Sequence, residues 1–417
     1  MLSVEEARDT VFARIERLAA ERVALLESLG CVLAADVVSD IDVAPFDNSA
    51  MDGYAVRAGD TAGASPESPV VLAVVDHIAA GVMPDVTVGP GQAARIMTGA
   101  PVPAGADAIV MVEHTEALEK AGSTGGTAAI LRTATVGDHI RRAAEDVHVG
   151  ETVLRAGEVV NPASVGLMAA LGVARVDVFR RPNVAIVSTG DELVGIEDRP
   201  GPGKIRNSNS YSLAAQVLAA GGLPHILGVA RDNEADTRAL LGRASDFDLM
   251  VTTGGVSMGD FDVVKDVLES MGTLDFWKVA MRPGAPQTYG TIGGTPFFGL
   301  PGNPTSTMVG FELFVRPSIR KMRGFADLDR PRVTATLAED IRKKADRRYF
   351  LRGVLSRTGS PEGTLAYEAR LSGRQSSAML TAMHRANCLI SLPEGLSQVS
   401  AGTLVECIRL DEEEGTP

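Results

Sequence analysis

Strands and helices alternate regularly between residues 183 and 322, and this alternation constrains the fold more than any other feature. Apolar runs typical of buried strands occur at residues 183–190, 225–230, 247–255 and 274–281. Segments with helical spacing separate or follow these runs, at residues 210–222, 234–245, 260–272 and about 303–322. Because parallel strands are joined by long crossovers, usually helices, this order predicts a doubly wound, mostly parallel sheet that helices cover on both faces.

The chain before this segment has a different character. Ser3 and Glu6 form a capping-box pattern at the start of a helix with regularly spaced apolar residues. Residues 32–155 instead hold short β-rich pieces between Gly-, Pro- and Ser-rich stretches, with a hairpin tip at 121–127. Pro162 starts another helix that ends near Gly172.

After about residue 327 the chain returns to short β pieces, such as residues 333–337 and 388–392. These pieces predict a small β barrel or sandwich at the C-terminal end. The acidic residues 411–414 are most simply a solvated tail.

Composition excludes several classes of protein. A formal net charge of -13 argues against general nucleic-acid binding, although a local basic cluster can still bind an anionic small molecule. The three cysteines form no CxxC pair, which fits a reducing compartment rather than a disulfide framework or a cysteine-rich zinc site. We see neither a signal peptide nor an apolar run long enough to span a membrane, and we therefore expect a cytoplasmic protein.

Three loops that follow strands carry the residues expected to bind a ligand. In an open parallel sheet, ligands bind beyond the carboxyl ends of the strands. The loops are STGDEL (188–193), TTGGVSMGDFD (252–262) and GLPGNPTST (299–307). In the second loop, Gly254 and Gly255 allow close backbone approach, and their N–H groups could line a site for an anion. Hydroxyl groups of Thr253 and Ser257 lie nearby in the sequence, and the loop is neither a Walker A nor a GxGxxG motif.

The acidic residues in these loops have two open interpretations. Asp262 is either the cap of the helix that follows it or a ligand of Mg²⁺, which takes one or two carboxylates beside phosphates. Asp260 is a weaker candidate for a Mg²⁺ ligand. Asp191 and Glu192 either cap a turn or place two acids at the same crevice. The prolines of the third loop either form a rigid structural turn or hold Ser306 and Thr307 at a helix N-terminus.

Two further segments carry charged residues of interest. Lys278 and Arg282 are four positions apart, so on one strand they would share a face, and like charges there would need an anion. In DNSAMDGYAV (47–56), Asp47 and Asp52 are metal or catalytic carboxylates, or else parts of an Asx-turn.

Six motifs taken together resemble the molybdopterin molybdenumtransferase (MoeA) family and the E domain of gephyrin. They are FDNSAMDGYAV, MTGAPVPAGADAIV, STGDEL, TTGGVSMGDFD, FWKVAMRPG and GLPGNPTS, and they occur in the order of the family. Each motif is only modestly specific, but the six in register cover almost the whole chain, from about Val4 to Ile408.

The resemblance implies an α/β multidomain fold with a three-layer molybdopterin-binding domain and a mostly parallel sheet. It implies an elongated N-terminal domain (1–44 and 144–180), a β-rich inserted domain (45–143), the α/β domain (181–326), a C-terminal β barrel (327–410) and an acidic tail (411–417). It also implies a homodimer, whose partner subunit completes the cleft. The implied reaction inserts molybdate into adenylylated molybdopterin and releases AMP, with Mg²⁺.

The resemblance also assigns residues. Those implied in catalysis are Asp52, Thr98, Glu192, Asp262, Lys278 and Arg282, with Asp262 and Glu192 as the metal ligands. Those implied in substrate binding are Thr189, Gly190, Asp232, Thr253, Gly254, Gly255, Ser257, Pro301, Asn303, Pro304, Arg352 and Ser377. A molybdopterin adenylyltransferase and molybdoenzymes that accept the cofactor are the implied protein partners.

The chain departs from the family pattern at two positions. Arg282 stands where the family usually has Lys, and a planar guanidinium is a different donor from an ammonium group. Ala144 stands where the family tends to have Gly. Two alternatives remain, a molybdopterin adenylyltransferase and a gephyrin-like scaffold with little catalysis. The N-terminal and C-terminal domains argue against the first, and the acids and basic groups of the loops argue against the second.

Overall fold

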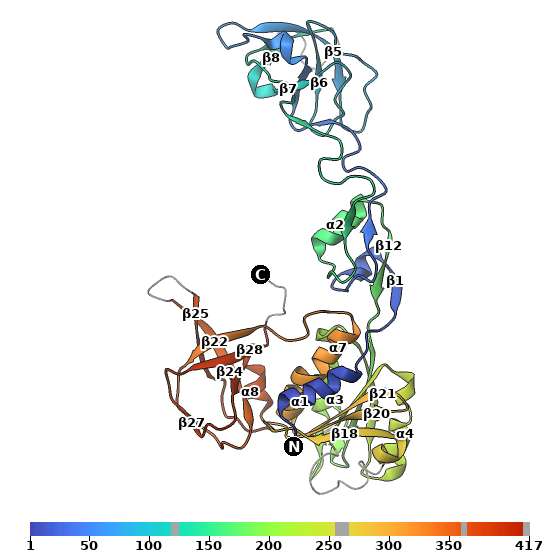
Figure 1. Ribbon diagram of the computed structural model, residues 1–417, viewed down its shortest axis with the longest axis vertical. Helices are drawn as coiled ribbons and strands as arrows, with labels where there is room; N and C mark the ends of the chain where they lie inside the picture. The colour runs from blue at the N-terminus through green and yellow to red at the C-terminus, as the bar shows by residue number, and fades with distance from the viewer. Residues whose placement is uncertain (118–124, 255–266, 360–364, 412–417) are drawn as a thin grey trace. The chain divides into compact units, whose positions relative to one another are not determined.

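The computed structural model describes residues 1–117, 125–254, 267–359 and 365–411. The contacts between its residues divide the chain into two compact units. The first unit contains Met1–Val23, Gly30–Ala34 and Asp177–Pro417, and the second contains Ala24–Leu29 and Ala35–Val176 (Figure 1). The finer division into four domains and a tail stays a prediction.

The first unit contains a six-stranded sheet in which the predicted parallel strands lie side by side. Its strand order is β16 (Leu223–Ala230), β13 (Asn183–Thr189), β17 (Leu249–Thr253), β21 (Thr295–Leu300), β20 (Pro286–Ile292) and β18 (Gly272–Lys278). Neighbours from β16 to β21 are parallel, whereas β20 is antiparallel to both β21 and β18. The mostly parallel sheet is confirmed, and β20 and β21 are additional to the predicted strands.

Alternating side chains of the central strand face two different hydrophobic cores. Val184 and Ile186 pack in one core, whereas Ala185 packs with Leu241 and Leu268 in the other. The first core is shared with α1 (Val4–Arg14), α3 (Ser208–Ala219), α6 (Pro304–Gly310), the π-helical η5 (Phe311–Val315) and α7 (Arg316–Met322). The second core includes the end of α4 (Glu234–Leu241). Because successive strand residues point to opposite faces, this arrangement confirms the three-layer architecture.

The predicted strand over residues 274–281 is wrong in one respect, because it is divided between two sheets. β18 ends at Lys278, whereas β19 (Met281–Arg282) pairs with the C-terminal barrel. Val279 and Met281 are both buried in the core of the first unit. The apolar pattern therefore continues through the break, and the sequence alone cannot reveal it. Lys278 and Arg282 do not share one face of one strand.

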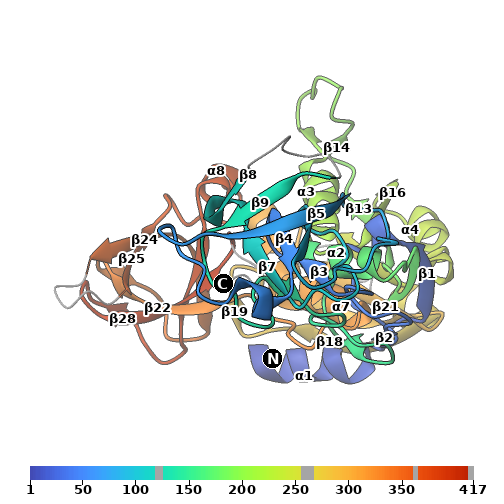
Figure 2. The same cartoon turned by 90° about the horizontal axis from the view of Figure 1, so that it is seen from above.

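A closed barrel forms the C-terminal part of the first unit. Its strands are β24 (Arg348–Gly359), β25 (Leu365–Leu371), β22 (Arg332–Leu337), β28 (Leu404–Arg409) and β26 (Cys388–Leu392). β26 pairs back with β24 and closes the ring, so the predicted barrel is confirmed. Figure 2 shows β22, β24, β25 and β28 together as one body.

The second unit contains another six-stranded sheet, which confirms the predicted β-rich region. Its strand order is β7 (Ala108–Met111), β4 (Gly53–Val56), β6 (Gln92–Ile96), β5 (Val70–Ile78), β9 (Thr127–Ile130) and β8 (Thr115–Ala117). Tyr54 and Val56 pack on one face, and Ala55 packs on the other. β8 and β9 are antiparallel, as a hairpin requires, and residues 121–124 of the predicted tip lie outside the described residues.

Shorter elements complete the described chain. The helices are α2 (Pro162–Ala170), α8 (Leu380–His384) and the 3-10 turns η1 (Leu25–Ser28), η2 (Ala58–Thr61), η3 (Val112–His114) and η4 (Ala244–Asp246). The strands are β1 (Ala20–Ala24), β2 (Val37–Val38), β3 (Asn48–Ser49), β10 (Ile140–Arg141), β11 (Thr152–Leu154), β12 (Arg175–Phe179), β14 (Leu193–Val194), β15 (Ile205–Arg206), β23 (Ile341–Arg342) and β27 (Gln398–Val399). Within the described ranges, no helix is both long and apolar enough to cross a membrane.

The Ala144 departure from the family pattern has a conformational explanation. Ala144 has a φ of 58°, in the left-handed region that favours glycine. Its N–H donates to the carbonyl of Ala44 at 2.8 Å, and the residue is 8% exposed. The surrounding structure thus holds an alanine in a backbone conformation that a glycine adopts without strain.

We predict that Ala144→Gly leaves the free energy of unfolding unchanged or raises it by up to about 1 kcal/mol. The substitution removes a left-handed penalty of about 1–2 kcal/mol but adds about 0.4–1 kcal/mol of chain entropy to the unfolded state. Calorimetry of the second unit's transition measures this effect. Ala169→Gly, in the exposed last turn of α2, is the control and should lower stability. Equal decreases in the free energy of unfolding of Ala144→Gly and Ala169→Gly would contradict the prediction.

Candidate functional site

The ends of three parallel strands bring the predicted loops to one edge of the sheet. Ser188 of β13 is in register with Thr253 of β17, and Thr253 is in register with Leu300 of β21. The residues that follow these strands are therefore neighbours in space, although they are far apart in the sequence. This edge is the location at which an open parallel sheet binds ligands.

The glycines at this edge allow close packing of the loops. Gly254 has a φ of 93°, and a Cβ there would lie 2.5 Å from the carbonyl oxygen of Thr189. The Gly254 N–H donates to the Leu300 carbonyl at 3.2 Å. The expectation that this N–H binds an anion is therefore corrected. Gly255, Ser257, Asp260 and Asp262 lie outside the described residues.

Hydroxyl and amide groups join the second and third of these loops to the start of α3. Thr253 Oγ1 donates to the Pro301 carbonyl at 3.1 Å and lies 3.2 Å from Thr307 Oγ1. Asn209 Nδ2, in the first turn of α3, donates to Thr253 Oγ1 at 2.9 Å and to the Gly302 carbonyl at 2.8 Å. The structure thus brings the predicted Thr253 and Pro301 together.

Sequence reasoning missed Asn209, which directly precedes the predicted helix over residues 210–222. The partners of Asn209 lie 44 and 93 positions later in the chain, so no local pattern reveals them. Thr189 Oγ1 at the end of β13 is buried, and no hydrogen-bond partner is found for it among the described residues.

The third loop starts α6 beside the barrel. Asn303 is the N-cap residue of α6, and Pro304 occupies its first turn. The Thr305 N–H donates to the carbonyl of Ser377 at 3.0 Å. Pro301, Asn303, Pro304 and Ser377 are therefore neighbours, although Ser377 comes from the loop after β25.

Arg352 of β24 is the most unusual cation of this region. It is 1% exposed, and its Nη2 donates to the Ser376 carbonyl at 3.2 Å. Its Nε has no hydrogen-bond partner among the described residues, and no carboxylate of that part of the chain forms an ion pair with it. Burial lowers the pKa of Arg352 to about 10, because the charged form loses hydration.

Arg282 contacts a different side chain. Its Nη1 donates to the Tyr349 hydroxyl at 3.4 Å, and its guanidinium carbon lies 5.5 Å from the centre of the ring. Arg282 and Tyr349 are in register, whereas Arg352 is three positions further along β24. Because strand side chains alternate, Arg352 and Tyr349 point to opposite faces. Lys278 lies at the exposed end of β18, in a different sheet from Arg282.

Two acidic loops meet beyond β13 and β16. The Asp191 N–H donates to Asp232 Oδ2 at 3.2 Å, and the Asp232 N–H donates to Asp191 Oδ1 at 3.4 Å. A Cβ at Gly190 would lie 2.4 Å from Glu192 Oε2, so the Glu192 carboxylate folds over this glycine. Lys204 Nζ donates to the Asp191 carbonyl at 2.6 Å. Among described residues, no three His, Cys, Asp or Glu side chains form a complete metal site.

In the second unit, the structure joins two residues that the sequence analysis assigned separately. Asp52 Oδ1 accepts hydrogen bonds from the Thr98 N–H and the Thr98 hydroxyl, both at 2.8 Å. These bonds, the backbone one first, lower the pKa of Asp52, with a smaller contribution from the charge of Arg95. Asp47 instead binds Arg142 at 2.6 Å and the Ala143 N–H at 2.8 Å. Asp47 thus joins two distant segments rather than closing a local Asx-turn.

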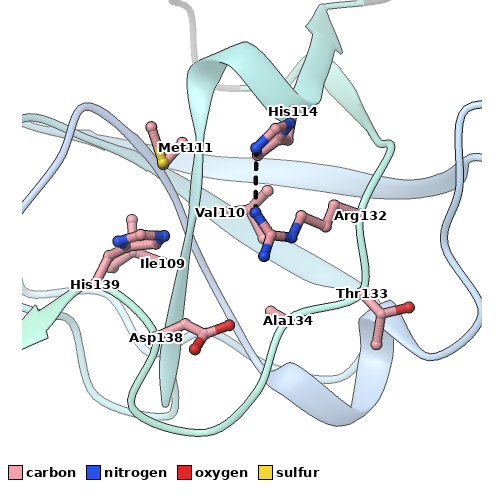
Figure 3. A pocket seen from close by; sticks show the side chains of 9 residues that line it. All are labelled: Ile109, Val110, Met111, His114, Arg132, Thr133, Ala134, Asp138 and His139. Carbon is pink, nitrogen blue, oxygen red and sulfur yellow. Dashed lines mark hydrogen bonds between the residues drawn. The ribbon is translucent and has the colours of Figure 1, made fainter.

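A pocket on the sheet of the second unit is separate from these candidates (Figure 3). In Figure 3, His114 and Arg132 face each other, with Nε2 and Nη1 3.3 Å apart. The Asp138 carboxylate accepts from the Thr135 N–H at 2.8 Å. No predicted site residue lines this pocket, and these polar groups already have protein partners.

We predict that Thr98→Val raises the pKa of the Asp52 carboxyl group. The variant removes the hydroxyl donor but keeps the backbone donor, so the pKa should stay below the ordinary value. Because the folded-state pKa is depressed, the stabilising contribution of Asp52 is present above its unfolded-state pKa. This contribution is lost as pH falls through the folded-state pKa. Carboxyl-selective NMR titration measures the change, and Asp47 is the internal control. An unchanged Asp52 titration would refute this role of Thr98.

Comparison with known proteins supports one family over the whole chain. The MoeA N-terminal region (domain I and II) matches residues 2–172, a probable molybdopterin binding domain matches 185–321, and the MoeA C-terminal region (domain IV) matches 334–410. A Mycobacterium tuberculosis protein named molybdopterin molybdenumtransferase 2 is 43% identical, covering 97% of this chain and 99% of its own. A Bacillus subtilis protein named molybdopterin molybdenumtransferase is 40% identical, with 95% and 91% covered.

Solved structures agree with the sequence comparison. The crystal structure of a molybdopterin biosynthesis moeA protein from Pyrococcus horikoshii OT3 has a TM-score of 0.80 at 30% identity. The match covers 98% of this chain and 100% of that chain. With the parallel sheet, the barrel and the shared motifs in place, the chain belongs to the molybdopterin molybdenumtransferase (MoeA) family.

Proposed function

We propose that this chain is a transferase of molybdenum cofactor biosynthesis that inserts molybdate into adenylylated molybdopterin and releases AMP. Relatives that match over the full length carry the name molybdopterin molybdenumtransferase. The observation that carries the proposal within this chain is Arg352, a guanidinium that is 1% exposed and has no carboxylate partner among the described residues.

Arg352 suits an oxyanion substrate. Burying a cation is unfavourable unless an anion or hydrogen-bond acceptors compensate the lost hydration. One carbonyl contact, from Ser376, leaves Nε without an acceptor in the part of the chain that the structure describes. Molybdate is a compact oxyanion whose oxygens only accept hydrogen bonds at neutral pH. Ser377, which follows Ser376 in the sequence, is proposed to help bind the substrate. Lys278 and Arg282 are proposed to help hold the substrate's other negative charges.

The acidic loops suit magnesium. Mg²⁺ in phosphate-binding sites takes one or two carboxylates and leaves its other positions to water and phosphate oxygens. Glu192 and Asp262 are the proposed ligands, and Asp232 and Asp191 place further carboxylates beside Glu192. When bound, the ion would neutralise phosphate charge and favour cleavage of the phosphate anhydride. Thr189 and Thr253 end the strands that frame this edge and are proposed to contact substrate.

Asp52 is proposed to act in its ionised form. The Thr98 hydrogen bonds lower its pKa, so the carboxylate is charged at neutral pH and can orient an attacking oxygen or a metal-bound water. We further propose that the chain works as a cytoplasmic homodimer, that it receives substrate from a molybdopterin adenylyltransferase, and that it delivers the product to molybdoenzymes.

The alternatives make different predictions in one assay. A molybdopterin adenylyltransferase would consume ATP and molybdopterin, whereas the proposed enzyme releases AMP only when molybdate is added. A scaffold would do neither at a useful rate. The full-length relatives named above do not favour either alternative.

We predict that Arg352→Met raises the KM for molybdate by at least about tenfold, because loss of a charged hydrogen-bond donor weakens oxyanion binding. AMP released from adenylylated molybdopterin is measured against molybdate concentration. Arg357→Met is the matched control, since Arg357 is on the same strand but exposed. Unchanged KM in Arg352→Met would contradict the proposed role, and wild-type AMP release without molybdate would contradict the proposed function.

We predict that Glu192→Gln and Asp262→Asn each raise the Mg²⁺ concentration needed for half-maximal AMP release by at least about tenfold. Each substitution removes a charge that a hard cation requires while keeping the side-chain shape. Glu197→Gln, an exposed acid five residues from Glu192, should leave this concentration unchanged. Magnesium dependence that stays at the wild-type value would show that these carboxylates do not hold the ion.

A further inference from the structure

Asn209 connects three elements at the carboxyl edge of the parallel sheet. It lies in the first turn of α3 (Ser208–Ala219), and its Nδ2 donates to the Gly302 carbonyl at 2.8 Å and to Thr253 Oγ1 at 2.9 Å. A weaker contact of 3.4 Å joins Nδ2 to Thr307 Oγ1. One amide group therefore joins α3 to the end of β17 and to the loop before α6.

These contacts determine which way the amide points. A backbone carbonyl can only accept hydrogen bonds, so the nitrogen of Asn209 must face Gly302. The oxygen, Oδ1, then points away from this group of acceptors. It is buried and has no hydrogen-bond partner among the described residues. A buried acceptor without a partner is unfavourable in the free protein, and a ligand that donates a hydrogen bond would relieve it.

The chemistry of Oδ1 excludes the anionic parts of the substrate. An amide oxygen only accepts, so molybdate and ionised phosphate groups, which also only accept, cannot satisfy it. The 2-amino-4-oxo ring of a pterin carries an exocyclic amine and a ring N–H on one edge. Bare backbone lies beside Asn209, because Gly302 bonds to it and a Cβ at Gly302 would lie 3.4 Å from the Gly254 Cα. Such a surface allows a flat ring to approach closely.

We propose that Asn209 Oδ1 accepts a hydrogen bond from the N–H edge of the pterin ring and so determines specificity for the heterocycle. The anionic groups of the substrate are bound by other residues. This inference rests on the proposed function and deepens it, since it assigns the ring, rather than the phosphate or metal, to this position.

Equilibrium binding tests the proposal with two ligands. In Asn209→Ala, the Kd for adenylylated molybdopterin, followed by pterin fluorescence, should rise by about tenfold to a hundredfold. The Kd for AMP alone should stay at the wild-type value, because AMP lacks the pterin ring. Asn209→Ser is the second variant, which keeps a favourable helix-start residue but replaces the amide oxygen by a hydroxyl on a side chain that is one atom shorter.

Asn207→Ala is the matched control for effects on folding. Asn207 lies two residues earlier and is 7% exposed, and its side chain bonds to Ser188 and Ser210 rather than to Thr253. This variant should lower thermal stability and leave both Kd values unchanged. Equal changes for pterin and AMP in Asn209→Ala, or wild-type affinity for the pterin ligand in both Asn209 variants, would overturn the inference. Wild-type protein that fails to bind adenylylated molybdopterin would overturn the proposed function as well.

Discussion

The parallel alignment of β13, β17 and β21 is the constraint on which the rest of the proposed site depends. Register aligns Ser188 with Thr253 and Thr253 with Leu300, so the strands end at one edge. The loops after β17 and β21 and the start of α3, which are far apart in the sequence, then share hydrogen bonds through Thr253, Asn209 and the Pro301 carbonyl. If one strand were reversed, its loop would emerge at the opposite end of the sheet, and this network could not form.

Two buried polar atoms without a hydrogen-bond partner among the described residues, Arg352 Nε and Asn209 Oδ1, divide the proposed site by chemistry. Arg352 is a cation that needs an acceptor, whereas Asn209 Oδ1 is an acceptor that needs a donor. A substrate pair made of an oxyanion and an N–H-bearing heterocycle satisfies both. The protein tolerates these groups because neighbouring bonds hold each side chain in place, as Ser376 does for Arg352 and Gly302 does for Asn209. Leaving these two groups unpaired is unfavourable in the free protein. A ligand that pairs with both groups is therefore favoured over one that cannot.

The two residues that depart from the family pattern, Arg282 and Ala144, each make a specific local contact. Arg282 directs its planar guanidinium to the hydroxyl of Tyr349, a geometry that a lysine ammonium does not reproduce. Lys343 lies over the same ring at 4.7 Å, so Tyr349 is bordered by two cations. Ala144 keeps a left-handed backbone without glycine, and its N–H remains bonded to Ala44. In each case the fold is retained although the residue type differs.

The sequence by itself determined the parallel sheet, the barrel and the loops at the strand ends, because apolar periodicity and glycine stops are local signals. It also identified Asp52 and Thr98, but only as separate residues of two motifs. Tertiary structure alone decided that Thr98 binds Asp52, that Lys278 and Arg282 lie in different sheets, and that Asn209 contacts Gly302. These facts depend on strand register and on contacts between distant segments, which no local pattern of residue types encodes.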